Sequence, residues 1–158
     1  KHHTLLLHAS FIEVNGRAIL FTAPSGTGKS TQADLWAKYE NAEIINGDRT
    51  LLTFTDGKWY ACGFPVCGSS EHCLNKTARL GAVICLKQAG ENHARKLNPI
   101  EALKNIYSQT FVNNWNKSDG TLALNLVSQL IEDVAVLEYS CTKEKDAVDY
   151  LKASLFPE

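Results

Sequence analysis

The stretch Ala23-Pro24-Ser25-Gly26-Thr27-Gly28-Lys29-Ser30 has the residue types of a phosphate-binding loop. Its two glycines permit backbone angles that turn successive N–H groups toward one anion, at the positive end of the following helix. A lysine after the second glycine reaches the β- and γ-phosphates of a nucleotide, and the hydroxyl beside it ligates Mg²⁺. We therefore expect ATP or another nucleoside triphosphate to bind at Ser25, Gly26, Thr27, Gly28, Lys29, Ser30 and Thr31.

The elements on either side of the loop give it the setting that phosphate binding requires. Residues 18–22 are a short apolar run typical of a buried strand, and residues 30–39 carry Trp36 and two alanines on one helical face. In the pattern G-x-x-x-x-G-K-[ST], Ala23 replaces the first glycine. The alternative is a Gly- and Ser-rich turn that binds nothing.

Composition narrows the classes of protein that remain. The chain has 158 residues, 44% hydrophobic and 21% charged, which predicts one domain over residues 1–158. A net charge of -1 argues against nucleic-acid and anionic-membrane partners. No apolar run approaches the roughly 18 residues of a membrane span and no signal-peptide pattern is present, so we expect a cytoplasmic protein. Because methionine is absent from the sequence, we expect Lys1 to be a trimmed end of a longer chain.

The five cysteines follow no regular framework, and we expect them to be reduced thiols. Cys62, Cys67, His72 and Cys73 crowd into one loop-like stretch, where a zinc site is the alternative. The usual C-x₂-C spacing is missing there, which favours loose or buried thiols.

Apolar alternation predicts several strands in the first half of the chain. Strands at residues 4–8 and 11–14 precede the turn Asn15-Gly16, which makes a hairpin with the strand before the loop. Residues 51–62 form a second hairpin. The segment 63–78 is predicted to be a long loop, a candidate lid or substrate loop.

The second half of the chain alternates strands and helices. Residues 80–86 and 134–139 are expected to be strands, and Asn98-Pro99 marks a capped helix start. Apolar faces are predicted for this helix, for a helix at residues 121–131 and for the closing helix. Their members are Ile100, Leu103, Ile106, Tyr107 and Phe111, then Leu122, Leu126, Val127 and Leu130, then Ala147, Val148, Leu151 and Leu155.

Together these elements predict an α/β fold. We expect a mixed, partly antiparallel twisted sheet flanked by helices, with the strand before the loop at its centre. The hairpins require antiparallel pairs, and the strand-helix-strand unit from residue 18 to residue 46 requires a parallel pair.

Asp48 ends the short strand predicted at residues 42–48, one helix and one strand after Lys29. This spacing, with the His8-Ala9-Ser10 stretch and the Asn15-Gly16-Arg17 hairpin before the loop, resembles the HPr kinase/phosphorylase family and its relative phosphoenolpyruvate carboxykinase. The similarity covers residues 5–52. The remainder is similar to small HPr-kinase-like proteins of bacteria.

The resemblance implies a fold like the C-terminal domain of HPr kinases and ATP-dependent phosphoryl transfer to a hydroxyl, a serine of a protein or peptide. Ser30 and Asp48 would hold Mg²⁺, Lys29 would act on the phosphates, and Asp48, assisted by His8, would take the hydroxyl proton. HPr kinases end this strand with two adjacent acids, whereas Gly47-Asp48 stands here. The elements that bind HPr are not recognisable, so the acceptor stays unidentified and a homo-oligomer stays open.

Other interpretations remain at the level of the protein and of single residues. The missing second acid favours a nucleotide-binding module without turnover, acting as a regulatory or scaffolding partner. A small-molecule kinase would carry its loop near the N-terminus, with no hairpin before it. Asp48 could instead cap the turn into Arg49, and His8 could be an ordinary histidine of an apolar strand. Arg49 and Arg79 are candidates for phosphate contacts, although solvated arginines are commoner.

Overall fold

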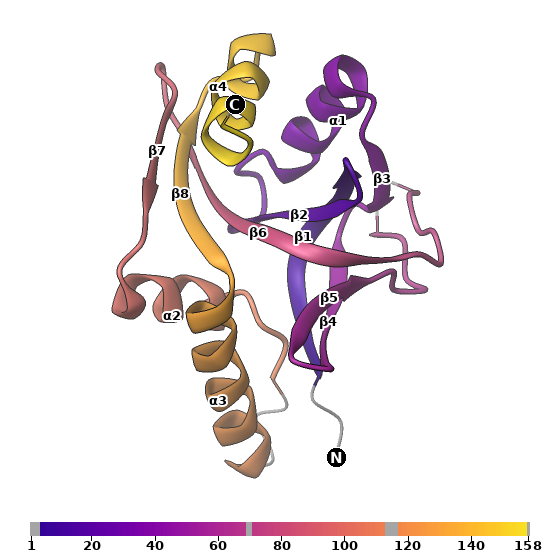
Figure 1. Ribbon diagram of the computed structural model, residues 1–158, viewed down its shortest axis with the longest axis vertical. Coiled ribbons are helices and arrows are strands. Elements are labelled where there is room, and N and C mark those ends of the chain that lie inside the picture. The colour runs from indigo at the N-terminus through magenta and orange to yellow at the C-terminus, as the bar shows by residue number, and fades with distance from the viewer. Residues whose placement is uncertain (1–3, 69–70, 113–116, 158) are drawn as a thin grey trace.

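The computed structural model describes residues 4–68, 71–112 and 117–157 (Figure 1). In these residues the elements follow the order β1 (Thr4–Val14), β2 (Arg17–Thr22), α1 (Lys29–Glu40), β3 (Glu43–Asn46), β4 (Arg49–Thr55), β5 (Lys58–Cys62), β6 (Thr77–Gln88), β7 (His93–Lys96), α2 (Pro99–Ser108), α3 (Lys117–Asp133), β8 (Ala135–Cys141) and α4 (Lys145–Leu155).

Both predicted hairpins are confirmed, and their turns explain why. Asn15 and Gly16 connect β1 to β2 with φ of 51° and 74°, and Asp56 and Gly57 connect β4 to β5 with φ of 52° and 76°. Asn, Asp and Gly tolerate this left-handed region better than other residues, and the resulting twist suits antiparallel strands. The two strands predicted at 4–8 and 11–14 are one continuous strand, β1.

The sheet is mixed, as predicted, with β2 in its interior. β1 pairs antiparallel with β2 on one side and with β3 and β4 on the other. β2 also pairs parallel with β6, and β6 pairs antiparallel with β5, which pairs with β4. These pairings close a ring of five strands, β1-β2-β6-β5-β4. The strands β8 and β7 extend the sheet from β6.

One detail of the predicted topology is wrong. We expected β2 and β3 to be parallel neighbours, but β3 pairs with β1, and the parallel partner of β2 is β6. The reason is that β1 already occupies one edge of β2 through the hairpin. β3 therefore pairs with the far edge of β1, so that β1 lies between β2 and β3.

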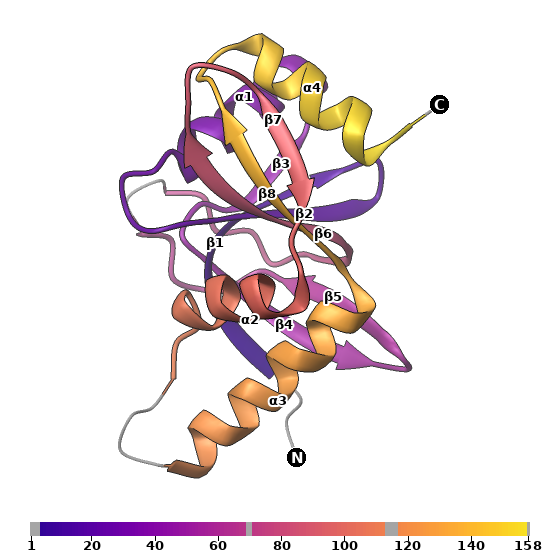
Figure 2. The same cartoon turned by 90° about the vertical axis from the view of Figure 1, so that its left-hand side faces the viewer.

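Helices cover both faces of the sheet (Figure 2). Helices α1 and α4 pack on one face, where Trp36 and Leu151 are fully buried with β-strand residues such as Phe21. Helices α2 and α3 pack on the other face, where Ile106 and Leu130 are fully buried. Because apolar layers on both sides exclude water, the interior strand β2 is held firmly up to its last residue.

Parts of the predicted helix faces are wrong. Ile100 is 80% exposed in the first turn of α2, Leu122 is 47% exposed on α3, and Phe111 lies beyond the end of α2. The backbone N–H of Phe111 donates instead to the carbonyl of Leu6 on β1, at 2.9 Å. The strand β7 was not predicted, because as an edge strand its side chains are largely exposed and show no apolar alternation.

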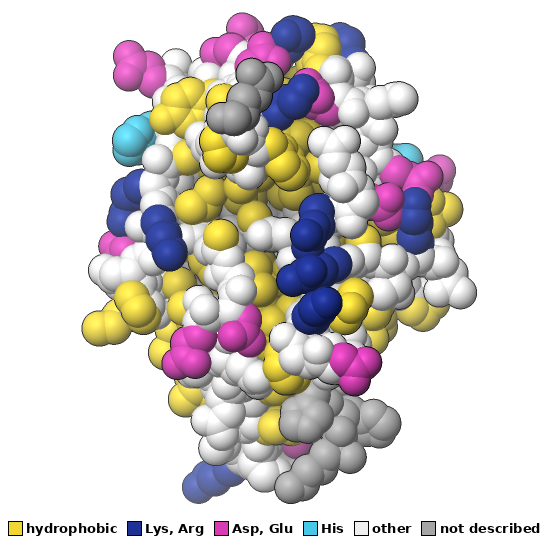
Figure 3. All heavy atoms as spheres, viewed as in Figure 1, with side chains coloured by type: hydrophobic (Ala, Val, Ile, Leu, Met, Phe, Trp, Pro, Cys, Tyr) yellow, Lys and Arg dark blue, Asp and Glu magenta, His cyan; other side chains and the backbone are white. Residues whose placement is uncertain are grey.

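The face of the molecule shown in Figure 3 carries side chains of both charges. Lys and Arg side chains form one group near the middle of the face in Figure 3, over β6, and acidic side chains are scattered across the rest of that face. Among the described residues, none of the helices has the length and apolar character needed to cross a membrane.

Candidate active site

The loop between β2 and α1 has the geometry expected of a phosphate-binding loop. Gly26 has φ of 81°, and Gly28, the N-cap of α1, has φ of 118°. These are left-handed values that residues with a side chain rarely adopt. A Cβ built on either glycine would meet nothing within 4 Å, so the glycines are required for their φ angles, and the space beside them is open. Ser25, Thr27, Ser30 and Thr31 lie on this loop and the first turn of α1.

Lys29 opens helix α1 and folds back over the loop. Lys29 is only 8% exposed, and its Nζ donates to the carbonyls of Ala23 at 2.8 Å and Pro24 at 3.4 Å. Burial lowers the pKa of Lys29, and the negative charge of Asp48 acts in the opposite direction. The lysine of the loop and the carboxylate of Asp48 are therefore within electrostatic reach of each other.

Gln88, at the end of β6, holds the loop from the neighbouring strand. Its Nε2 donates to the carbonyls of Gly26 at 3.2 Å and Thr27 at 3.1 Å. This contact could not be predicted from the sequence, because nothing in the local pattern shows that the end of β6 lies beside the end of β2.

Asp48 contacts two basic side chains. Its Oδ1 lies 3.5 Å from Nε2 of His8, and its Oδ2 accepts from Nε of Arg49 at 3.0 Å. The side chains of His8 and Asp48 are 23% and 30% exposed, so the pair is accessible from solvent. Phe111 lines the same place, with its ring edge-on to His8 and 5.0 Å from the guanidinium carbon of Arg49. The structure thus places His8 in contact with Asp48, the two residues for which the sequence predicted a joint role.

The middle of β1 connects the loop to Asp48. Ala9 is opposite Thr22 of β2, the residue before the loop, and the Thr22 hydroxyl donates to the His8 carbonyl at 2.8 Å. On its other side, β1 places His8 opposite Arg49 of β4. The Ala9 N–H donates to the Asp48 carbonyl at 3.1 Å. The loop after β2 and the turn that carries Asp48 therefore lie on opposite sides of the single strand β1.

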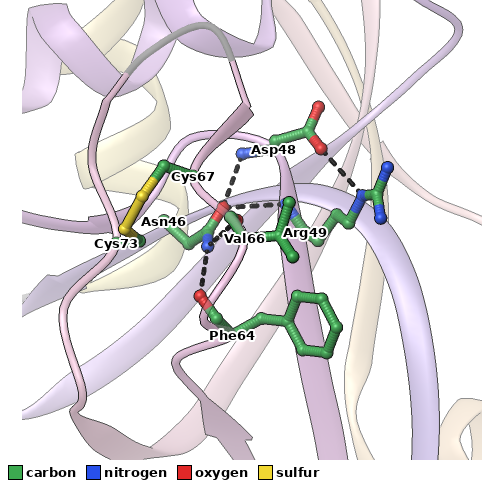
Figure 4. The surroundings of a disulfide bond; sticks show 7 residues. All are labelled: Asn46, Asp48, Arg49, Phe64, Val66, Cys67 and Cys73. Atoms are coloured by element: carbon green, nitrogen blue, oxygen red, sulfur yellow. Dashed lines mark hydrogen bonds and ion pairs between the residues drawn. A yellow bond between two sulfur atoms is a disulfide. The ribbon is translucent and has the colours of Figure 1, made fainter.

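The side chain of Asn46 sets the backbone around Asp48, and sequence reasoning missed it. Asn46 is fully buried at the end of β3, and its Oδ1 accepts from the N–H groups of Asp48 and Arg49 at 2.8 and 2.9 Å (Figure 4). Its Nδ2 donates to the carbonyls of Phe64 and Val66 at 2.9 and 3.0 Å. Turn formation by Asn is a known local signal. The two carbonyls, which come from a distant loop, have no signal in the sequence.

The expectation of five reduced cysteines is wrong for two of them. Cys67 and Cys73 form a disulfide, while Cys62, Cys85 and Cys141 are free thiols. The disulfide uses two of the four residues considered for zinc, and no group of three metal-ligating side chains is found among the residues described. Proximity made by a folded loop, rather than cysteine spacing, decided the pairing.

Arg79 lies away from the loop, whereas Arg49 contacts Asp48. Arg79 is opposite Arg17, at the start of β2, whereas the loop follows the end of β2. Arg17, Arg79 and Asp133 line a cavity of about 330 Å³ at the far end of β2 from the loop. Arg79 is therefore not a candidate for the phosphates of a ligand in the loop.

Comparison with known proteins gives a likeness of fold. No protein-family model matches the sequence, and no curated protein matches it. Among solved structures, the HPr(Ser) kinase/phosphatase from Coxiella burnetii is similar, with a TM-score of 0.52 over 94% of this chain and 91% of that chain. The sequences are 9% identical. At this identity the likeness shows the fold alone: a mixed α/β sheet flanked by helices, related in fold to a kinase/phosphatase.

Proposed function

We propose that the protein transfers a phosphoryl group from ATP, or another nucleoside triphosphate, to a hydroxyl group, with a serine of a protein or peptide as acceptor. One observation carries the proposal: Asp48 contacts His8 and lies within electrostatic reach of Lys29 in the loop. A carboxylate within electrostatic reach of a lysine that binds phosphate can serve as the base for an attacking hydroxyl. The fold likeness to a kinase/phosphatase supports the same class of reaction.

The residues of the loop suit a triphosphate and Mg²⁺. The open space beside Gly26 and Gly28 leaves room for phosphate at the start of α1. Ser30 and Asp48 would hold Mg²⁺, which uses one or two protein ligands and takes the rest from phosphate and water. The metal would neutralise charge on the phosphates. Residues 25–31 would hold the nucleotide.

The remaining chemistry belongs to the chain's own side chains. Lys29 needs only to exchange its two carbonyl acceptors for phosphate oxygens. Asp48 accepts the proton of the attacking hydroxyl, and Arg49 fixes the orientation of the carboxylate through Oδ2. His8 assists at Oδ1, either by holding the carboxylate or by receiving the proton in turn.

The test is transfer of label from γ-labelled ATP into acceptors of a bacterial lysate, for the wild type and Asp48→Asn. We expect the variant to lose about 10²- to 10⁴-fold in rate, because an amide is a negligible base. Its affinity for Mg-ATP should fall only modestly. Asp56→Asn is the matched control, because it makes the same substitution in the exposed turn between β4 and β5. Equal labelling by wild type and Asp48→Asn would refute the role of Asp48.

A second candidate is a nucleotide-binding module without turnover. It is favoured by Gly47, which replaces the second acid, and by the engagement of both Asp48 carboxylate oxygens with His8 and Arg49. Tight binding of ATP, together with no label in any acceptor, would support this candidate over the kinase.

A further inference from the structure

The disulfide loop, residues 63–68 and 71–74, connects β5 to β6 and lies against the Asp48 turn. At one end the Gly63 N–H donates to the Lys76 carbonyl, and at the other the Leu74 N–H donates to the Ile45 carbonyl, both at 2.8 Å. Cys73 also forms an isolated bridge with Asn46 at the end of β3. The Cys67–Cys73 disulfide links the two arms of the loop at this point (Figure 4).

The loop contacts Asp48 directly through Gly68, the residue after Cys67. A Cβ built on Gly68 would lie 2.6 Å from the Cβ and 2.9 Å from the Cγ of Asp48, so the two residues are packed as closely as their atoms allow. Gly68 also has φ of 59°, in the left-handed region that favours glycine. The backbone at residue 68 therefore restricts the positions open to the Asp48 side chain.

A second contact connects the same loop to the backbone of Asp48. The Asn46 amide holds the Phe64 and Val66 carbonyls through its nitrogen, and the Asp48 and Arg49 N–H groups through its oxygen. An amide bound at both ends is fixed in orientation. Displacement of the loop carbonyls would release Asn46, and with it the turn that carries Asp48.

The disulfide is more accessible to solvent than two of the three free cysteines, Cys85 and Cys141. Cys67 and Cys73 are half-buried in a surface loop. Cys85 and Cys141 are buried, and burial raises the pKa of these thiols to about 12 and about 11. Exchange requires an accessible sulfur and a thiolate, so a soluble dithiol is able to reach the disulfide and the buried thiols are inert.

We propose that the Cys67–Cys73 disulfide is a redox switch for the candidate active site, which fixes Asp48 for catalysis when formed and releases it when reduced. The regulatory part rests on the function proposed above; the structural part does not. A thiolate of an external dithiol attacks one sulfur, and the S–S bond breaks to give a mixed disulfide. The second thiolate of the reductant then displaces the protein sulfur. Two electrons and two protons pass to Cys67 and Cys73, and the dithiol becomes a cyclic disulfide.

The proposal makes separate statements about structure and rate. Reduction should speed exchange of the Asp48 and Arg49 amides, because Asn46 loses its loop partners. It should lower the rate constant for phosphoryl transfer and change the KM for ATP much less, because residues 23–28 lie between β2 and α1 and outside the disulfide loop. Gly68 and Asn46 are positioning residues in this scheme, since they act through Asp48.

The first measurement is a thiol count in denatured protein after incubation with oxidised glutathione. Three thiols are expected, for Cys62, Cys85 and Cys141, and five would overturn the proposal. Amide exchange is then followed by NMR with and without dithiothreitol. We expect about tenfold faster exchange at Asp48 and Arg49 on reduction, reversed by reoxidation. Unchanged exchange, with reduction confirmed by mass, would overturn the proposal.

The rate measurement uses variants that separate the switch from general damage to the fold. Cys67→Ser/Cys73→Ser should behave like reduced wild type under all conditions, and Cys62→Ser, a half-buried thiol on β5, should keep the full response. Gly68→Ala retains both cysteines but should lower the rate constant for transfer in both redox states, with a much smaller change in KM. If reduction speeds amide exchange at Asp48 and Arg49 but leaves the rate of phosphoryl transfer unchanged, the regulatory role is wrong. Responsive exchange with no transfer in either state would refute the proposed function and leave the structural part standing.

Discussion

The candidate phosphate-binding loop and the Asp48 turn are built in different ways. The loop is one continuous stretch, residues 23–28, between a strand and a helix, and its shape depends on two glycines with positive φ. The Asp48 turn depends on contacts from separate segments: His8 of β1, Asn46 of β3, Gly68 of the disulfide loop, and Phe111 after α2.

This difference indicates where each half is vulnerable. A substitution within the loop should change ligand binding and leave the rest of the molecule intact, because few long-range contacts pass through it. Substitutions around Asp48 should change both stability and the placement of the carboxylate, because the same groups serve both. Four experiments test this contrast, taken from the largest expected effect to the smallest.

Asn46→Ala should have the largest effect, which is a loss of stability. The substitution leaves two N–H groups and two carbonyls without their buried partner, which should lower the free energy of unfolding by about 2–4 kcal/mol. Urea denaturation measures the change. The matched control is Asn105→Ala on the exposed side of α2, expected to stay within about 0.5 kcal/mol. Similar losses in both variants would show that the Asp48 turn does not depend on Asn46.

Lys29→Ala should lower the affinity for Mg-ATP by about 100-fold, because a charge-assisted contact to phosphate is lost. The fold should survive, since the partners of Nζ are two carbonyls of the loop itself. Calorimetric titration measures the affinity, and Lys38→Ala, an exposed lysine on the same helix, is the control. Equal binding by Lys29→Ala and wild type would place the nucleotide elsewhere.

His8→Ala should slow phosphoryl transfer by about 10- to 100-fold if the imidazole assists Asp48. Nucleotide affinity should not change, because His8 contacts the carboxylate side of the site. The control is His93→Ala, which removes an exposed imidazole from the edge strand β7. If transfer by His8→Ala equals that of the wild type, His8 is an ordinary strand histidine.

The smallest effect is a pH dependence of ATP affinity in the range where Lys29 loses its proton. Burial lowers the pKa of Lys29 in the free protein, and bound phosphate should raise it again. Below the lowered pKa both states carry the proton, so affinity should be constant. As the pH rises through that pKa, only the bound state keeps the proton, and affinity should fall by up to about tenfold per pH unit. Lys29→Ala should not show this fall.

The local features of the fold were predictable from residues close together in the sequence. Asn15-Gly16 and Asp56-Gly57 specified the hairpins, and Asn98 and Glu101 form the capping box that starts α2. The two glycines of the loop, which the motif singled out, have the positive φ values expected of them. Each of these depends on turn chemistry or helix periodicity within a few residues. The α/β class followed from them. The catalytic and metal-binding roles of Ser30, Asp48 and His8 stay predictions.

The tertiary structure decided which segments meet. The parallel pairing of β2 with β6, the contact of His8 with Asp48, the four bonds of Asn46 and the Cys67–Cys73 disulfide all join residues that belong to different elements. Such contacts depend on strand order and register, which many arrangements of the same elements would satisfy locally. Only the packing of both sheet faces selects one arrangement. The sequence alone therefore determined the loop and its hairpins, and the folded chain determined what lies opposite them.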